Sequence, residues 1–334
     1  MAERVLTERA LNRALLARQL LLERARLPIP RALERIGGIQ NQYAPSGYVG
    51  LWTRLERFER EALTRALERR TVVQGTLMRE TIHLVSKRDY WPLALGIREA
   101  RRAWALRVDK TLTEQGQQRR ARELRAALAH GPRGRELDPL VRGHVMLWLD
   151  VVRVPPSGTW ERRRADRYAL AEDWLGQPEI TEHDAVDRLV RRYLGAFGPA
   201  PLQDVSRWSG VPAANLAPSV ERLDLRRFRD EAGKELLDLP RAPLPHPDTP
   251  APVRFLPHFD ACLLVHVRRA GLLPEEHRAR IFQTKNPFSV GAVLVDGRVA
   301  GAWNVRDGRV VVEAYERLPS EVEDERERLE AFHA

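Results

Sequence analysis

Apolar residues recur at helical spacing in the N-terminal part of the chain and then give way to short apolar runs. The helical spacing predicts four helices, over residues 7–24, 28–36, 45–58 and 59–69. The two runs at 71–73 and 81–85 are typical of strands joined by a turn near Arg79. Short helices followed by a β-ribbon predict a winged helix-turn-helix module over residues 1–110.

The same order of helices and strands recurs further along the chain. A less regular copy covers residues 111–178, and a clearer copy covers residues 179–240. In the clearer copy, two helices flank a short turn at Gly210, which is helix-turn-helix geometry. A hairpin over 225–239 then predicts a basic wing that contacts DNA through four side chains: Arg226, Arg227, Arg229 and Lys234.

Prolines mark the beginning of a different region. The proline-rich stretch 241–252 predicts a linker, because proline cannot continue a helix or a central strand. Short apolar runs over 253–334, with a hairpin turn at residues 295–298, predict a small β-rich domain that ends in a charged helix over 320–334. The expected fold class is therefore α+β, mainly α, with tandem winged helix-turn-helix modules followed by this β-rich C-terminal domain.

Composition narrows the partners. The chain has 334 residues, with 56 lysines and arginines against 46 aspartates and glutamates, and this net charge of +10 favours a polyanion such as nucleic acid. Arginine codons in a GC-rich genome are an alternative source of the arginine excess, but the positive charge remains either way. Cys262 is the only cysteine, which excludes an intrachain disulfide and a cysteine-based zinc site. Without a membrane span or a signal-peptide core, we expect a cytoplasmic protein.

The segment after residue 36 carries the sharpest candidate chemistry. Gly37 and Gly38 favour the left-handed conformation that ends a helix, so the chain beyond them should be extended. Alternate side chains of an extended segment share a face, so Gln40 and Gln42 would converge on one ligand. Taken alone, however, Gln-Asn-Gln is more often part of a polar loop.

Four segments together resemble a known family. They are 38–42 (Gly-Ile-Gln-Asn-Gln), 77–85 (Leu-Met-Arg-Glu-Thr-Ile-His-Leu-Val), 256–260 (Leu-Pro-His-Phe-Asp) leading to His266, and 293–303. In this order they resemble the winged-helix DNA glycosylases typified by AlkZ and YcaQ, and the resemblance spans nearly the whole chain. It implies hydrolysis of the N-glycosidic bond of N7-alkylguanine in double-stranded DNA, including bulky adducts and interstrand cross-links. AlkZ-like members are associated with self-protection in makers of DNA-alkylating natural products.

The resemblance also assigns site residues. The family's Gln-x-Gln catalytic motif maps onto Gln40 and Gln42, and no cofactor or metal is implied. Arg79, Thr81 and His83 are expected to contact DNA. Arg79 at a turn is alternatively a solvated surface residue, and His83 in an apolar strand is alternatively a hydrogen-bonded structural residue. The family's central residue is usually apolar and here is Asn41, which would need hydrogen-bond partners if buried. Asp260 either fixes the C-terminal region or touches the cleft.

Glutamine does not titrate near neutral pH, so these residues cannot act as ordinary general bases. An N7-alkylguanine already carries a positive charge and leaves without a general acid. Two amide oxygens would then position a water and stabilise the cationic sugar. A non-catalytic winged-helix DNA-binding protein, either a regulator or a lesion sensor, is the main alternative, and a metal nuclease ranks last. We expect a monomer.

Overall fold

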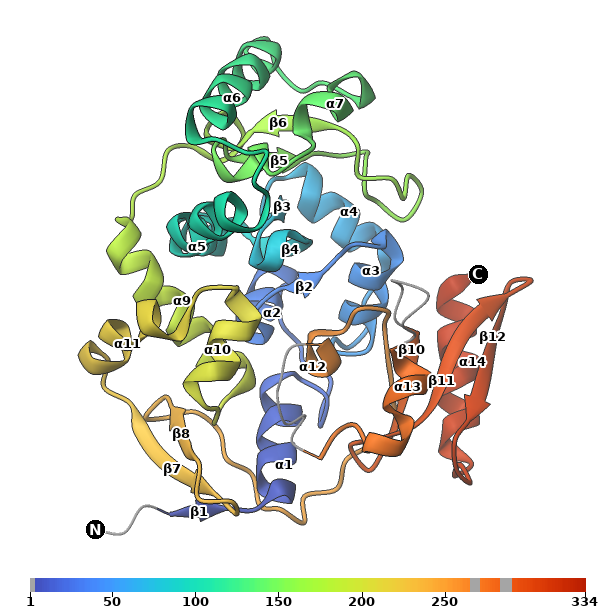
Figure 1. Cartoon of the computed structure of the whole chain (residues 1–334). Coiled ribbons are helices and arrows are strands. Elements are labelled where there is room, and N and C mark those ends of the chain that lie inside the picture. Colours follow the sequence, from blue (N-terminus) through green and yellow to red (C-terminus); the bar gives the residue numbers. More distant parts are fainter. Residues whose placement is uncertain (1–3, 265–270, 283–289) are drawn as a thin grey trace.

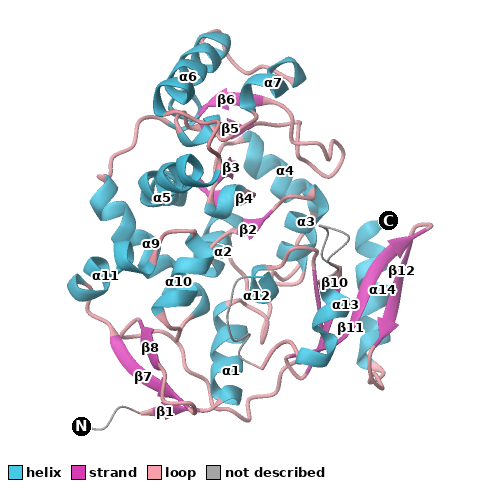
Figure 2. Ribbon diagram, viewed as in Figure 1, coloured by secondary structure: helices cyan, strands magenta, loops and turns pink. Residues whose placement is uncertain are grey.

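The computed structural model describes residues 4–264, 271–282 and 290–334. His266, from the sequence comparison above, lies outside these residues. Figure 1 shows a helical body that carries one small sheet at its lower left, another through its centre, and a third beside the C-terminal helix at its right. Figure 2 shows the same separation of the strands into three places. The α+β, mainly helical class is confirmed, and the tandem winged-helix arrangement stays a prediction.

The N-terminal helices lie close to where the apolar spacing predicts them: α1 (Glu8–Arg18), α2 (Ile29–Ile36), α3 (Ala44–Trp52) and α4 (Arg60–Glu68). The hydroxyl of Thr7 accepts a hydrogen bond from the backbone N–H of Ala10 and so caps α1 as expected. Helix α1 ends earlier than expected, because Leu20 adopts a left-handed backbone with φ of 56°.

A five-stranded sheet forms the centre of the molecule, with the strand order β2-β4-β3-β5-β6. Its strands are β2 (Ile39–Gln40), β3 (Val72–Thr76), β4 (Ile82–Ser86), β5 (Val151–Arg153) and β6 (Tyr168–Leu170). The last two come from the segment expected to form the second module, yet β5 pairs directly with β3. The sheet therefore joins segments on both sides of residue 110, and the division into modules stays a prediction.

Seven further helices cover this sheet and the region below it. They are α5 (Lys87–Val108), α6 (Glu114–Leu128), α7 (Asp138–Val141), α8 (Ala171–Leu175), α9 (Glu182–Phe197), α10 (Leu202–Ser209) and α11 (Ala213–Arg222). Helices α5 and α9 pack against each other along the main apolar core. Gly210 is left-handed with φ of 78° and separates α10 from α11, as the turn pattern predicts.

The expected wing is the hairpin of β7 (Arg226–Asp230) and β8 (Glu235–Asp238). The sequence pattern did not reveal that β1 (Val5–Leu6) adds to it as a parallel third strand. A pairing between such distant segments has no local signature, since a two-residue strand is too short to show alternation. The wing is thereby tied to the N-terminal end of the described chain.

The C-terminal region is β-rich as predicted. Its sheet has the order β12-β11-β10-β9, from β9 (Arg254–Leu256), β10 (Gly291–Val295), β11 (Arg298–Arg306) and β12 (Arg309–Ala314). Asp296 and Gly297 form the tight turn between β10 and β11, both at positive φ. Two short helices, α12 (Ala261–Leu264) and α13 (Arg278–Ile281), precede β10, and α14 (Glu321–His333) packs on β12 and β9.

Candidate functional site

The first glutamine is placed by a helix end and a very short strand. Gly37 caps α2 in the left-handed conformation, and the chain then extends as β2, as the glycine pair predicts. In the antiparallel pairing, Gln40 lies directly opposite His83 of β4. Gln40 is buried, and its Oε1 accepts a hydrogen bond of 2.9 Å from Nη2 of Arg79. The structure therefore brings Gln40, Arg79 and His83 together.

The second glutamine lies on the solvent side of the same segment. Gln42 is exposed, and its Oε1 accepts a 3.1 Å hydrogen bond from the backbone N–H of Ile82. Both amide oxygens are thus held by donors from residues 79–82, which fixes how each carboxamide is turned. A carbonyl oxygen has two lone pairs, so each retains one acceptor position for a further ligand.

Asn41, the departure from the family pattern, is buried and has its hydrogen-bond partners. Its Oδ1 accepts from the backbone N–H of Gly47 at 3.0 Å, and its Nδ2 donates to Oε1 of Gln74 at 3.1 Å. Gln74 in turn donates from Nε2 to the carbonyl oxygen of Ser157 at 3.3 Å. The desolvation of Asn41 is therefore compensated, and a buried polar chain links the motif to the segment after β5.

Arg79 sits on a strained turn. Arg79 and Glu80 are consecutive non-glycine residues with left-handed backbones, at φ of 54° and 58°. The turn is held by the Glu80 carboxylate, which accepts from Arg101 at 3.0 Å and contacts His144 Nδ1 at 2.7 Å. No local sequence pattern indicates this support, because Arg101 and His144 come from segments distant along the chain. Its effect is to aim the Arg79 side chain at Gln40.

The charge of Arg79 has no carboxylate partner among the residues that the structure describes. Its side chain donates to the carbonyl oxygen of Trp208 and to Gln40. Burial, together with the nearby positive charge of Arg101, lowers the pKa of Arg79 to about 10. Arg79 therefore stays positively charged at neutral pH and is compensated only by neutral oxygens, an arrangement that an anion would stabilise.

His83 is a buried, neutral residue. Burial, followed by the charge of Arg79, lowers its pKa to about 3. Its Nδ1 lies 3.0 Å from the carbonyl oxygen of Thr81, which can only accept, so Nδ1 carries the proton. The Thr81 hydroxyl donates to the carbonyl oxygen of Met78 at 3.1 Å. The structural alternative for His83 accounts for these contacts, and the DNA contacts of Thr81 and His83 stay predictions.

The basic wing lies in a different sheet, away from β2 in Figure 1. Arg226 is paired with Asp238 at 2.5 Å and Arg227 with Glu235 at 2.6 Å. Arg229 donates to the carbonyl oxygen of Gly233, and the backbone N–H of Lys234 donates to Asp230. The structure does not bring these four residues to the glutamines, and their contact with DNA stays a prediction.

Asp260 has a structural position. Both of its carboxylate oxygens accept from Nη2 of Arg54, at 3.1 and 2.8 Å, and both side chains are buried. The remaining N–H groups of Arg54 donate to backbone carbonyls of Gln19 and Gly50. Asp260 therefore fixes the C-terminal region against the N-terminal helices.

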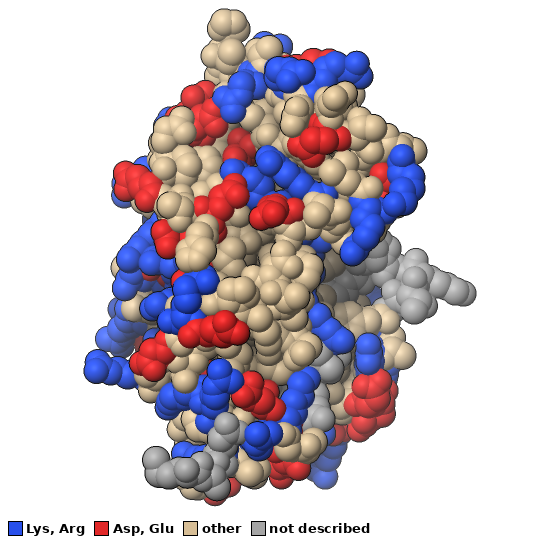
Figure 3. All heavy atoms as spheres, turned by 60° about the vertical axis from the view of Figure 1, so that its left-hand side comes forward, with Lys and Arg blue, Asp and Glu red and all other residues tan. Residues whose placement is uncertain are grey.

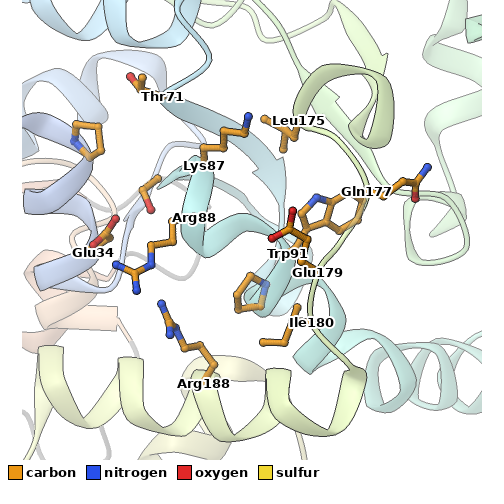
Figure 4. A pocket seen from close by; sticks show the side chains of 13 residues that line it. Glu34, Thr71, Lys87, Arg88, Trp91, Leu175, Gln177, Glu179, Ile180 and Arg188 are labelled. Atoms are coloured by element: carbon orange, nitrogen blue, oxygen red, sulfur yellow. The ribbon is translucent and has the colours of Figure 1, made fainter.

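Basic side chains also occur on the surface and around a cavity outside the glutamine motif. Figure 3 shows lysine and arginine side chains on several sides of an uncharged hollow in one face. A cavity of about 730 Å³ lies at the start of α5, where Figure 4 shows Lys87, Arg88 and Arg188 among its lining side chains. None of the predicted site residues lines it. Within residues 4–264, 271–282 and 290–334, no metal-binding group of histidine, cysteine and carboxylate side chains occurs, and no helix is long and apolar enough to cross a membrane.

The class of protein to which this fold and its pair of carboxamides belong follows from comparison with known families. The model of the family described as DNA glycosylase AlkZ-like matches residues 33–332, so this chain belongs to that family. The family resemblance inferred from the sequence is thereby confirmed.

Two relatives make the likeness more specific. A curated protein of Streptomyces sahachiroi, described as an interstrand DNA cross-link repair glycosylase, is 30% identical over 163 residues. The match covers 44% of this chain and 42% of that relative, so it spans less than half of either. The solved structure of Streptomyces sahachiroi DNA glycosylase AlkZ superposes with a TM-score of 0.79 over 98% of this chain and 96% of that one. At 19% identity, this second likeness establishes the fold.

Proposed function

We propose that this protein is a monofunctional DNA glycosylase that hydrolyses the N-glycosidic bond of N7-alkylguanine in double-stranded DNA. Family membership supports the glycosylase class. The observation that carries the finer proposal is that Gln40 and Gln42 both have their amide oxygens held by residues 79–82. Preorganised neutral dipoles of this kind suit a reaction in which a cation develops.

The chemistry follows from what these groups cannot do. Neither carboxamide takes up a proton near neutral pH, and His83 is buried beside a cation. The leaving base must therefore already be activated, as it is in N7-alkylguanine, which carries a formal positive charge. Water attacks C1′ of the sugar, the C1′–N9 bond breaks with its electron pair going to the base, and the water proton passes to solvent. The amide oxygens orient that water and stabilise the positive charge on the sugar.

Arg79 requires a separate role, because a guanidinium beside Gln40 repels a developing cation. We assign it to a phosphate of the target strand, which would supply the negative charge that the described residues do not provide. Neutralised in this way, Arg79 keeps its hydrogen bond to Gln40 without opposing the reaction. The expected DNA contact of Arg79 thus becomes part of the proposed mechanism.

The proposal includes bulky N7 adducts and interstrand cross-links, because the curated relative is described as a cross-link repair glycosylase. Such an activity serves either general DNA repair or self-protection against genotoxic natural products. We place it in the cytoplasm, with the protein acting as a monomer. The alternative, a regulator or lesion sensor without catalysis, would bind the same DNA and release no base.

Base release from duplex DNA carrying N7-methylguanine tests the proposal. Wild type is compared with Gln40→Ala and Gln42→Ala, at protein concentrations that saturate DNA binding. We expect wild type to release the base and both variants to bind DNA without releasing it. Duplexes with a bulky N7 adduct or a cross-link form the second substrate set.

Unmodified adenine and uracil are the matched control bases. Release of either at a rate comparable to N7-methylguanine would overturn the mechanism, since neutral bases need a proton donor. Tight binding without release of any alkylated base would instead establish the non-catalytic alternative.

A further inference from the structure

The segment between β5 and β6, residues 154–167, is a long and well-anchored loop that we call the β5–β6 arm. Figure 1 shows it as the yellow-green loop that reaches from these strands toward α3. Trp160 at its tip is buried, with its ring 5.5 Å from that of Tyr48 and 5.6 Å from that of Phe332, centroid to centroid. The arm is therefore pinned between α3 and α14.

Hydrogen bonds within the arm fix its backbone. The hydroxyl of Ser157 donates to Asp166 and accepts from the Asp166 backbone N–H, both at 2.8 Å. The backbone N–H of Gly158 donates to the carbonyl oxygen of Arg162 at 2.7 Å. A loop closed in this way holds its exposed side chains in place, which lowers the entropy cost of binding a ligand.

Three consecutive arginines on the arm are exposed, and they differ in their partners. Arg164 is paired with Asp138 at 3.0 Å and with Asp166 at 3.2 Å. Neither Arg162 nor Arg163 forms an ion pair with any carboxylate in the described part of the chain. Two guanidinium groups with unmatched charge thus project from a rigid loop.

Arg163 lies directly beside the glutamine motif. Its Nη1 donates to the hydroxyl of Tyr43 at 3.3 Å, and its guanidinium carbon lies 6.0 Å from the centroid of the Tyr43 ring. Tyr43 follows Gln42 without an intervening residue. A strand whose base is held at Gln42 would therefore pass within reach of Arg163.

A buried chain of hydrogen bonds from Asn41 through Gln74 to Ser157 also connects the glutamine motif to the arm. All three side chains are buried, so a shift of the arm would disturb hydrogen bonds of the motif itself. The polar residue at the centre of the motif is thus what couples the motif to the arm. These hydrogen bonds connect the arm to the residue between the two glutamines.

We propose that the β5–β6 arm is a phosphate-binding element, in which Arg162 and Arg163 contact the DNA backbone next to the nucleotide held by Gln40 and Gln42. Guanidinium groups suit this role because their N–H donors match two phosphate oxygens at once. The position of these contacts beside the target base rests on the proposed function. The binding of backbone phosphate itself does not.

The test measures the affinity of the full-length protein for undamaged duplex DNA by fluorescence anisotropy, between about 50 and 200 mM salt. The double variant Arg162→Ala/Arg163→Ala should bind roughly tenfold or more weakly. Its plot of log affinity against log salt should be less steep by about 2, or about 1 per arginine. Replacement of both residues by lysine should restore most of the slope.

The matched control removes two charges elsewhere. Arg88 and Arg188 line the cavity at the start of α5 and form no ion pair with described residues. The variant Arg88→Ala/Arg188→Ala should keep the wild-type slope. An equal loss in this control, or a wild-type slope in the arm variant, would overturn the proposal.

A second measurement separates this inference from the proposed function. Base release from N7-methylguanine duplex by wild type decides the function, whatever the arm does. If wild type releases base and the arm variant binds DNA normally, the glycosylase function is supported and the phosphate-binding role of the arm is rejected. If wild type releases no base and the arm variant binds DNA with a reduced salt slope, the role of the arm is supported and the glycosylase function is rejected.

Discussion

Arg54 is a buried arginine and Arg79 is a half-buried one, and their surroundings are opposite. Arg54 meets the carboxylate of Asp260. Burial is the largest single influence on the pKa of Arg54 and lowers it, but the attraction and hydrogen bonds of Asp260 and Cys262 together raise the pKa above its usual value. Arg79 meets only neutral oxygens of Trp208 and Gln40, and its pKa is lowered to about 10. One charge is satisfied within the protein, while the other is left for a partner.

The difference extends to other arginines. Arg13 and Arg18, which join α1 to the C-terminal half, pair with Asp296 and Asp238. Arg163, which contacts Tyr43, and its neighbour in the chain Arg162 form no ion pair with a carboxylate in the described part of the chain. The arginine excess therefore divides into groups that hold the fold together and groups available to an external anion. Net charge alone does not reveal this division.

Removal of the paired charge of Arg54 should have the largest effect on stability. Arg54→Ala leaves Asp260 buried and unpaired, and it should lower the free energy of unfolding by about 3–5 kcal/mol, measured by urea unfolding. Replacing both partners with apolar residues, Arg54→Met/Asp260→Leu, should recover part of this loss. A loss below about 1 kcal/mol in Arg54→Ala would contradict the structural role.

Removing the charge of Arg79, which has no carboxylate partner among the described residues, should affect base release more than stability. Arg79→Gln should change the free energy of unfolding by less than about 1 kcal/mol, since it removes a half-buried cation without leaving a carboxylate unpaired. Base release from N7-methylguanine should fall roughly tenfold to a hundredfold, in line with one charge-assisted hydrogen bond. Single-turnover rates with Arg79→Lys, which keeps the charge but not the planar fork, separate charge from geometry. Unchanged release in Arg79→Gln would remove this residue from the mechanism.

The motif centre gives an intermediate effect. Asn41→Leu supplies the apolar residue usual in the family, but it leaves the backbone N–H of Gly47 and Oε1 of Gln74 without their hydrogen-bond partner. We expect a loss of about 1–3 kcal/mol in unfolding free energy. The double variant Asn41→Leu/Gln74→Leu should lose less than the sum of the two single variants. Strict additivity would show that the two side chains are not coupled.

Acid should destabilise the protein through His83. The pKa of His83 is about 3 in the folded protein, against 6.5 for an ordinary histidine, so the unfolded chain binds the additional proton. The contribution is complete above pH 6.5 and is lost progressively as the pH falls towards 3. Between pH 7 and pH 5, the free energy of unfolding should fall by up to about 2 kcal/mol from this residue.

Urea unfolding across this pH range checks the prediction. His83→Asn should flatten the dependence, and His246→Asn, at an exposed position, should leave it as in wild type. An unaltered pH profile in His83→Asn would assign the acid sensitivity to other groups.

The smallest effect is expected at the wing. Arg227 and Glu235 form an exposed pair, so Arg227→Ala should cost less than about 1 kcal/mol in stability. Its effect on DNA affinity should also be smaller than that of Arg163→Ala, because Glu235 already balances the charge. A larger salt-slope change at Arg227 than at Arg163 would reverse the comparison and favour the wing as the main DNA contact.

The sequence predicted local structure well where periodicity and glycines carry it. The extended segment after Gly37 and Gly38, the turn at Gly210 and the turn at 295–298 all follow from short-range rules. The early end of α1 did not follow, because the left-handed backbone at Leu20 has no glycine to announce it.

The candidate site was predicted in part. Family resemblance assigned catalysis to Gln40 and Gln42, and a DNA contact was expected separately at Arg79; these roles stay predictions. The structure adds that contacts among residues 40–42 and 79–82 join the three side chains. The support of Glu80 and the role of Gln74 depend on long-range packing, which no local pattern records. Asn41 departs from the apolar residue usual in the family, and in the structure its side chain connects the motif to Gln74.

The pairing of β3 with β5 limits how this protein can be divided. A fragment ending at residue 110 would lose β5 and expose one edge of β3, a row of unpaired backbone donors and acceptors. Such edges recruit strands from other chains, so the fragment should aggregate or be digested by proteases. The glutamines would be present in it, but the arm that steadies them would be missing. Expression trials of separate modules should therefore keep residues 39–170 in one piece.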